Sequence, residues 1–418
     1  MTEDNRLSKV EILIQQKKFA EAEKILSDLL GEDSANIHFL SLLAEVYLQQ
    51  GKFDNANSII DNAIGISPDA PYLFYIKSRI AIHQDSLGEA EKYINNAINL
   101  DPYDADYFAL LANIKLGRKQ FGEALEISER ALEIDAENLG ALNARSTALN
   151  KLNRSEESFK TIEGALREDP NNAYTHANYG WGLLEKGDHK KALEHFKEAL
   201  TNDATLAYAQ AGMLEALKAT NPIYRMFLKY SFWMSNLTAK YQWGVIIGFY
   251  LGFRALKAIA RSNAGLQPYL LPLIIALALI AFSTWVIAPI SNLFLRFNKY
   301  GQLLLGKAEK ISSNFVAVSF GVFIVGLLLY FALSDERFLA IAAFGFAMML
   351  PLGSMLSPSK NKNALLIYTT VLAIVGIIAI SLVYATGEMF NVMTTVFVLG
   401  FVGFQWVTNY LLIKEDNQ

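Results

Sequence analysis

The sequence has 418 residues, of which 52% are hydrophobic, a content that is high for a chain soluble throughout its length. Residues 1–221 hold 23 Lys and Arg against 35 Asp and Glu, and residues 222–418 hold 14 against 6; the acidic first half argues against a nucleic-acid partner, because phosphate-backbone binding needs clustered basic residues. The absence of cysteine excludes disulfides, thiolate nucleophiles, iron–sulfur clusters and cysteine-ligated zinc.

The first half of the chain repeats with a period of 34 residues. Small residues occupy two columns of this repeat, and proline occupies a third. The first column is Ala22, Ala56, Ala90, Ala124, Ser158 and Ala192, the second is Leu29, Ala63, Ala97, Ala131, Ala165 and Ala199, and the third is Pro68, Pro102 and Pro170. Small residues let two helices in each unit approach closely, and proline ends the second helix. The spacing therefore predicts six helix pairs.

These columns resemble the tetratricopeptide repeat. The second unit matches that pattern best, at Leu43, Ala44, Tyr47, Gly51, Phe53, Ala56, Ile60, Ala63 and Pro68. The tryptophan usual early in the first helix is absent. Residues 205–219 have the pattern of a solitary helix that caps the last exposed apolar face. We expect an all-α fold in which residues 1–220 form a solenoid of six repeats plus a capping helix.

The resemblance implies a superhelix whose concave face, lined by the first helix of each unit, binds a peptide or protein helix. We expect seven residues on this face: Tyr72, Tyr75, Arg79, Asn113, Asn143, Tyr174 and Trp181. Asparagine can hydrogen-bond an extended peptide backbone, and aromatic rings offer rigid contact area. Packing of the inner helices explains any single one of these positions equally well. Lys and Arg are not arranged as in the clamp by which some members of the family hold a C-terminal carboxylate.

After Pro222 the composition becomes aromatic and basic. Residues 222–240 are predicted to form an amphipathic linker helix in the membrane interface, with Arg225, Lys229 and Trp233 at its polar boundary. A short core helix is the alternative. Residues 241–418 then hold apolar runs of about the length that crosses a bilayer. Six spans are predicted, at 241–260, 269–290, 314–334, 337–356, 364–385 and 390–413.

The first of these runs is the weakest as a span, because it is interrupted by Arg254. It carries Gly244, Gly248 and Gly252 at four-residue spacing, which predicts close packing against another helix. The basic residues Arg296 and Lys299 are expected on the cytoplasmic membrane surface under the positive-inside rule. Arg254 and its basic neighbours lie on the wrong side in a six-span topology, but treating the first run as interfacial would move the basic loop after 290 outside.

Nothing in the sequence indicates catalysis. All five histidines lie in the repeat half, so the apolar half contains neither the serine–histidine pair of a rhomboid-type protease nor a histidine zinc motif. The middles of the second to sixth apolar runs lack ionisable residues, which disfavours a coupled transporter. We therefore predict no enzyme activity, no cofactor and no metal.

The preferred interpretation is a membrane-anchored scaffold that collects a protein or peptide at the cytoplasmic face of a membrane, with lipid as a second partner. The start of the chain lacks a secretory signal, so both termini are expected in the cytoplasm, and the plan resembles that of a bacterial multi-pass protein of the inner membrane. The alternative is a channel, lipid-handling or envelope-assembly protein regulated by its repeats, since six spans exceed what anchoring needs. The oligomeric state and the partner's identity stay open.

Overall fold

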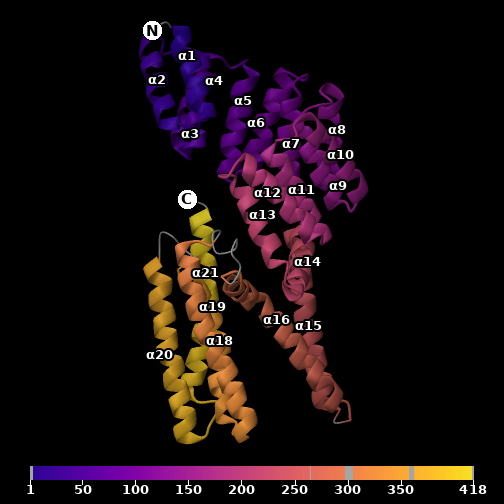
Figure 1. The fold of residues 1–418 in the computed structure, drawn as a ribbon, viewed down its shortest axis with the longest axis vertical. Helices are drawn as coiled ribbons and strands as arrows, with labels where there is room; N and C mark the ends of the chain where they lie inside the picture. The colour runs from indigo at the N-terminus through magenta and orange to yellow at the C-terminus, as the bar shows by residue number, and fades with distance from the viewer. Residues whose placement is uncertain (1–2, 264, 297–304, 357–361, 417–418) are drawn as a thin grey trace. The chain divides into compact units, whose positions relative to one another are not determined.

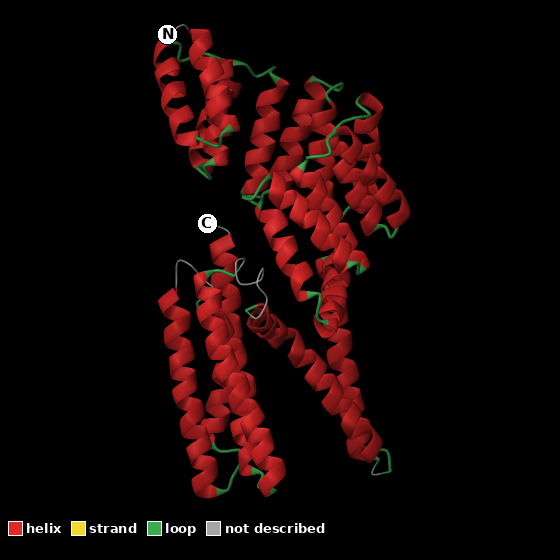
Figure 2. Ribbon diagram, in the orientation of Figure 1, coloured by secondary structure: helices red, strands yellow, loops and turns green. Residues whose placement is uncertain are grey.

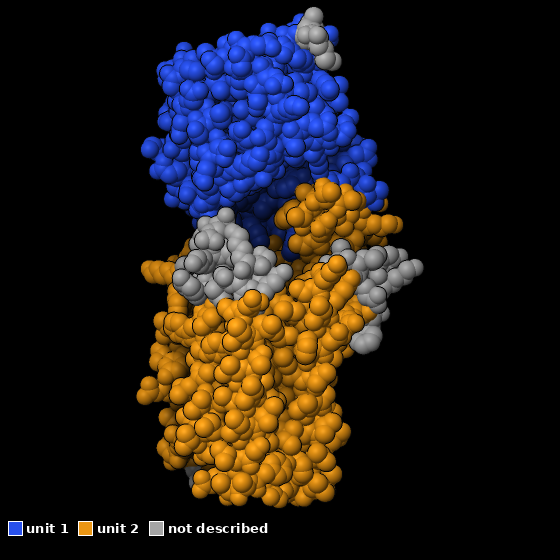
Figure 3. All heavy atoms as spheres, turned by 90° about the vertical axis from the view of Figure 1, so that its left-hand side faces the viewer, with its two compact units in different colours: residues 1–182, 201–203 blue, residues 183–200, 204–418 orange. Residues whose placement is uncertain are grey.

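The computed structural model describes residues 3–263, 265–296, 305–356 and 362–416, and every regular element among them is an α-helix (Figures 1 and 2). The chain divides into two compact units (Figure 3). Residues 1–182 and 201–203 form the first, and residues 183–200 and 204–418 form the second. The predicted all-α fold class is confirmed.

Six helix pairs carry the 34-residue repeat, and each pair begins with a helix of 13 or 14 residues. The pairs are α1 (Glu3–Gln15) and α2 (Phe19–Glu32), α3 (Ile37–Gln49) and α4 (Phe53–Ile66), α5 (Pro71–His83) and α6 (Leu87–Leu100), α7 (Ala105–Gly117) and α8 (Phe121–Ile134), α9 (Leu139–Lys151) and α10 (Ser155–Glu168), and α11 (Ala173–Lys186) and α12 (His189–Asn202).

The two small-residue columns lie in the core of the repeats. Every alanine of both columns is fully buried, and Ser158 and Leu29 are almost fully buried. Large aliphatic residues such as Ile60, Ile76 and Ile94 fill the space around them. Because an alanine at a helix crossing admits the neighbouring helix where a larger residue would overpack it, the columns explain why each unit closes into a pair.

The turn inside each pair adopts the same left-handed conformation. Residues with positive φ recur every 34 residues, at Lys17, Gly51, Asp85, Lys119, Asn153 and Gly187. A left-handed residue ends a helix by letting the next amide groups bond back to its last carbonyls, and here the amide of Gln120 bonds to the carbonyl of Lys115. Glycine adopts this conformation without steric cost, yet only two of the six positions are glycine.

We expect Lys119→Gly to raise the free energy of unfolding by about 0.5–1 kcal/mol, because a side chain at φ +61° is strained against the following carbonyl. Asn153→Gly should gain less, since asparagine tolerates this conformation better than lysine. Urea denaturation of the two variants beside the wild-type chain measures the difference. Equal gains, or a loss at Lys119, would contradict this account.

Eight further helices follow the repeats. They are α13 (Ala207–Lys218), α14 (Pro222–Asn236), α15 (Ala239–Ser262), α16 (Gln267–Leu295), α18 (Lys307–Leu333), α19 (Arg337–Ser354), α20 (Lys362–Thr386) and α21 (Val392–Asp416). α13 occupies the range predicted for the capping helix, and Ala209, Gly212 and Ala216 form its buried face.

Four helices in the described part of the chain are long and apolar enough to cross a membrane. They comprise Lys240–Ser262, Lys307–Leu333, Arg337–Ser354 and Asn363–Thr386. The described apolar parts of α16 and α21, Gln267–Ala278 and Val392–Thr408, are shorter. Spans at these two helices therefore stay predictions.

The closest helix approach in the second unit joins α18 and α19. A Cβ built on Gly345 would lie 2.5 Å from the backbone nitrogen of Phe323, and one built on Gly326 would lie 2.6 Å from that of Ala342. The Ser319 hydroxyl donates to the Gly345 carbonyl at 2.7 Å. Backbone thus touches backbone at two points of one crossing.

The glycines that were predicted to pack closely do not do so among the described residues. A Cβ added at Gly244, Gly248 or Gly252 would meet nothing within 4 Å, and only 6% of the apolar window of α15 is buried. Glycine permits a close approach without supplying the neighbouring helix, and α15 has none on this face in the described chain.

Candidate functional site

Three tyrosines gather where α5 and α7 meet in the first unit. The rings of Tyr72 and Tyr75 stack with centroids 5.8 Å apart, and the ring of Tyr75 lies 5.5 Å from that of Tyr107. Tyr107 is buried, whereas Tyr72 is 46% exposed. Burial raises the pKa of all three hydroxyls, so they remain neutral. The cluster presents an anchored aromatic surface to solvent.

Arg79 joins this cluster to the preceding repeat. Its guanidinium forms an ion pair and a hydrogen bond with Glu45 of α3 and lies 5.5 Å from the Tyr75 ring centre. Burial raises the pKa of Glu45, although Arg79 opposes the shift. Desolvation of the carboxylate therefore outweighs the attraction of the ion pair.

The pKa of Glu45 predicts a pH dependence of stability. Because its pKa is raised in the folded state, its contribution to stability is present below the ordinary value of 4.5 and is lost as the pH rises through the folded-state pKa. We expect the free energy of unfolding of Glu45→Gln, relative to wild type, to increase from pH 4 to pH 7. Urea denaturation across this range, with the exposed Glu133→Gln as control, measures the change; a flat or falling difference would contradict it.

The two asparagines expected on the concave face differ in exposure. Asn113 is exposed, and its amide donates to the carbonyl of Ala109 at 2.9 Å. Asn143 is only 4% exposed and donates to the Thr175 hydroxyl at 2.9 Å. The amide of Asn178 donates in turn to the side-chain oxygen of Asn143 at 3.1 Å. Asn143 therefore bonds α9 to α11 and does not present its amide to a ligand.

The remaining predicted residues lie on α11. Tyr174 is 47% exposed, and Trp181 is half-buried. The first helices of successive repeats contact one another, α3 with α5 and α7 with α9. We call the accessible predicted set on these helices the first-helix face; it consists of Tyr72, Tyr75, Arg79, Asn113, Tyr174 and Trp181.

The basic residues of α14 make local contacts in the second unit. The Nε of Arg225 donates to the carbonyl of Ala219 at 3.0 Å, at the end of α13. Lys229 lies over Gly187, with its Cε 2.9 Å from where a Cβ would be. Trp233 is 50% exposed. Arg225 thus terminates the capping helix, and Trp233 remains accessible.

The other predicted interface residues follow α16. Arg296 donates a hydrogen bond to the side chain of Asn314 on α18. Lys299 lies outside the described residues. Their placement at a membrane surface remains a prediction.

Comparison with known proteins bears on the repeat half of the chain. Family models described as tetratricopeptide repeat match residues 13–77, 47–114 and 144–207. The chain is a tetratricopeptide-repeat protein. No curated protein matches it.

Several solved structures resemble the tetratricopeptide-repeat half. YrrB, described as a tetratricopeptide-repeat protein with an unusual peptide-binding site, is 18% identical over 44% of this chain and 96% of its own, with a TM-score of 0.31. A tetratricopeptide-repeat protein from Parabacteroides merdae is 16% identical over 51% and 82%, with a TM-score of 0.45. TTC0263 from Thermus thermophilus is 14% identical over 44% and 99%, with a TM-score of 0.41.

Sequence analysis missed one surface beside the tetratricopeptide repeats. The exposed side chains of α14 form a stripe at spacings of three and four residues, which we call the α14 stripe. Its members are Ile223, Met226, Tyr230 and Trp233, each at least 44% exposed. Tyr224 and Leu228 are the buried residues of the helix. The helical spacing of the four residues was the available signal, and Trp233 was the only member predicted.

Proposed function

We propose that this protein is a membrane-anchored, non-enzymatic scaffold that binds an extended peptide or a helix of a partner protein on its first-helix face. Tetratricopeptide repeats are protein-interaction modules. The observation that carries the proposal is the anchored aromatic surface around Tyr72, where one exposed ring stacks on Tyr75 and that ring packs on buried Tyr107. Rings held in this way lose little conformational entropy when a ligand covers them.

The chemistry of the first-helix face favours a peptide with apolar or aromatic side chains. Tyr72 and Tyr174 expose nearly half of their surfaces, and aromatic residues are enriched among those that dominate binding energy. The charge of Arg79 is already partnered by Glu45. The exposed amide of Asn113 has hydrogen-bonding capacity for a peptide backbone. We therefore assign affinity to ring contacts and orientation to backbone hydrogen bonds.

The membrane part of the proposal is supported by the second unit. Four described helices have the length and hydropathy to span a bilayer. The α14 stripe immediately precedes the first of them, and tyrosine and tryptophan favour the boundary between lipid and water. Tethering would raise the effective concentration of a bound partner beside the bilayer.

We further propose that the repeats face the cytoplasm of a bacterial cell. Arg296, Lys307 and Lys310 lie between α16 and the apolar part of α18, whereas Arg337 is the basic residue of the α18–α19 connection. An excess of basic residues marks the cytoplasmic loops of membrane proteins.

Topology is testable because the sequence has no cysteine. We expect Tyr103→Cys, on an exposed repeat turn, to react with a membrane-impermeant maleimide only after cells are permeabilised. Glu388→Cys, between α20 and α21, should react in intact cells. The reverse pattern would refute the proposed orientation, and reaction of both in intact cells would refute the cytoplasmic placement of the repeats.

Partner binding is tested by a photo-crosslinking amino acid at Tyr72 or Tyr174 of the full chain in cells. Tyr103, which is 80% exposed on a turn, is the matched aromatic control. We expect both first-helix positions to capture the same discrete protein, and the control to capture none of it. Identical products at all three positions, or no product at any, would refute the proposed binding face.

A further inference from the structure

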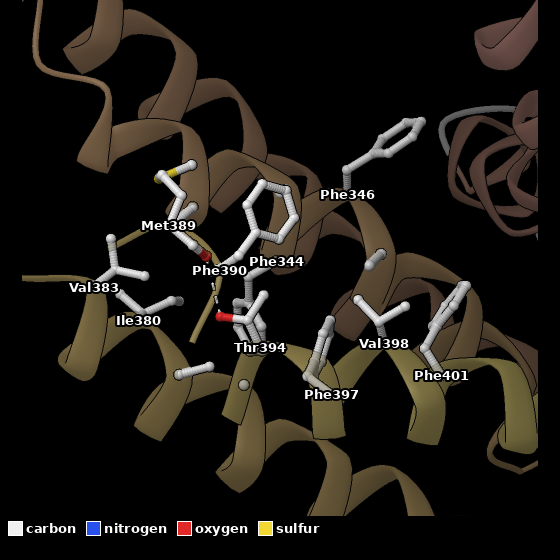
Figure 4. A pocket seen from close by; sticks show the side chains of 15 residues that line it. Phe344, Phe346, Ile380, Val383, Met389, Phe390, Thr394, Phe397, Val398 and Phe401 are labelled. Carbon is white, nitrogen blue, oxygen red and sulfur yellow. Dashed lines mark hydrogen bonds between the residues drawn. The ribbon is translucent and has the colours of Figure 1, made fainter. Parts of the chain in front are cut away.

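A cavity of about 370 Å³ lies between α19, α20 and α21 (Figure 4). Residues within 340–347 of α19, 376–383 of α20 and 389–401 line it. These stretches belong to the beginning of α19, the end of α20 and the beginning of α21. Phe390 at its edge is 89% exposed, so the cavity reaches the surface of the bundle.

The lining of the cavity is hydrocarbon and aromatic carbon. Of the lining residues that the structure describes, Thr394 alone has a polar side chain, and its hydroxyl donates to the Met389 carbonyl at 3.2 Å (Figure 4). A polar group entering the cavity would lose its hydration without gaining a partner. The cavity therefore selects an apolar occupant.

Packing around one glycine shapes the cavity. A Cβ on Gly376 would lie 2.3 Å from Cε2 of Phe344, so only glycine lets this ring lie directly on α20. The rings of Phe344 and Phe397 are 5.8 Å apart. Across from Phe397, Ala343 and Ala347 on α19 leave open the space that larger side chains would fill. The aromatic rings are fixed while the alanines leave room.

The size of the cavity fits one hydrocarbon chain. Small-ligand sites occupy roughly 300–1,000 Å³, and a helix of about 10 Å diameter is too wide for a cavity of about 370 Å³. Along α19 the lining extends about 10 Å, at a rise of roughly 1.5 Å per residue. That length lies within one leaflet of a hydrocarbon core about 30 Å thick.

Charged residues stand at the neighbouring end of the bundle. Arg337 begins α19, pairs with Asp335 and lies 5.4 Å from the ring centre of Tyr384. Glu336 and Glu388 add two carboxylates beside it in the sequence, and Glu388 directly precedes the lining residue Met389. One guanidinium among three carboxylates favours a head group that carries an ammonium and disfavours a free carboxylate.

We propose that the cavity holds one acyl chain of an aminophospholipid whose head group lies beside Arg337 and Glu388. The inference rests on the membrane placement proposed above and goes beyond anchoring, because it makes one lipid a bound ligand of the bundle. The surrounding solvent of the exposed apolar helices then supplies the ligand.

The test uses the full chain in vesicles of phosphatidylethanolamine and phosphatidylglycerol with a trace of phosphatidylethanolamine bearing a photoreactive acyl chain. Mass spectrometry compares labelling at the lining residues Phe397 and Phe401 with labelling at Val371 and Ile374, which are exposed on α20 and do not line the cavity. We expect Ala343→Phe to reduce labelling of the lining residues several-fold and to leave the two α20 positions unchanged. Ala347→Phe is a second filling variant, and Ala332→Phe on the exposed end of α18 is the control.

Equal labelling of the lining residues in the filling and control variants would overturn the inference. Parallel vesicles with a photoreactive phosphatidylglycerol or free fatty acid test the ligand class, and labelling by either one equal to that by phosphatidylethanolamine would overturn the assignment to an aminophospholipid. A crosslinked second copy of the chain at Phe397 would replace the lipid with a protein occupant. Absence of labelling at Val371 and Ile374 would instead refute the membrane placement itself.

Discussion

Replacing Gly345 with leucine is expected to disrupt the packing of α18 against α19 and to lower the free energy of unfolding of the second unit by about 3 kcal/mol, the upper part of the usual range for overpacking. The new Cβ would fall 2.5 Å from the Phe323 nitrogen and 2.8 Å from the Ser319 carbonyl oxygen. Both are backbone atoms, so relief requires a shift of a whole helix. Thermal unfolding in detergent, followed by circular dichroism, measures the loss.

Two control variants make this prediction specific. Gly321→Leu lies on α18, and Gly248→Leu lies in the triplet on α15; a Cβ at either position would meet nothing within 4 Å. We expect both to unfold within a few degrees of wild type. A loss at Gly248 as large as at Gly345 would show that the triplet packs against a partner helix outside the described chain, as the sequence pattern predicted.

Asn143→Ala should lower the free energy of unfolding of the repeats by about 1–3 kcal/mol, because it leaves buried polar groups without a partner. Thr175 would lose its hydrogen bond from the Asn143 amide, and Asn178 would lose the acceptor at Asn143 Oδ1. Thr147 completes this network by donating to Asn178 at 3.0 Å. Urea denaturation, monitored through tryptophan fluorescence, gives the change.

Asn113→Ala is the matched control for this prediction. The Asn113 amide is exposed and bonds only within its own helix in the structure, to the Ala109 carbonyl. Its loss should change stability by about 0.5 kcal/mol or less. If Asn113 cost as much as Asn143, burial of the hydrogen-bonded network would not be the cause.

The repeat fold could be predicted because its determinants recur. One alanine such as Ala56 carries little information, but an alanine or serine at the same place in six units fits only a helix crossing that is repeated six times. The left-handed turns could not be predicted in the same way. Lys17, Lys119 and Asp85 are not residues that announce this conformation, and only Gly51 and Gly187 suggest it.

The candidate site was harder to predict because one helical position can serve two purposes. Asn143 and Asn113 both occupy first helices, but only Asn143 faces polar residues of the next repeat, Thr175 and Asn178. That pairing depends on residues about 32 to 35 positions away and leaves no local pattern. Likewise, Gly326 and Gly345 form one crossing from two helices, and neither belongs to a glycine period that sequence reasoning could detect.

The recurring left-handed turn also bears on how such a chain changes length in evolution. Because Gly51, Asp85 and Lys119 have the same backbone sign at intervals of 34 residues, a duplicated or deleted segment of that length joins two ends of matching geometry. In-frame gene duplication therefore adds one further segment to the first-helix face without requiring a new kind of turn. A segment of any other length would place a helical residue where the chain must reverse.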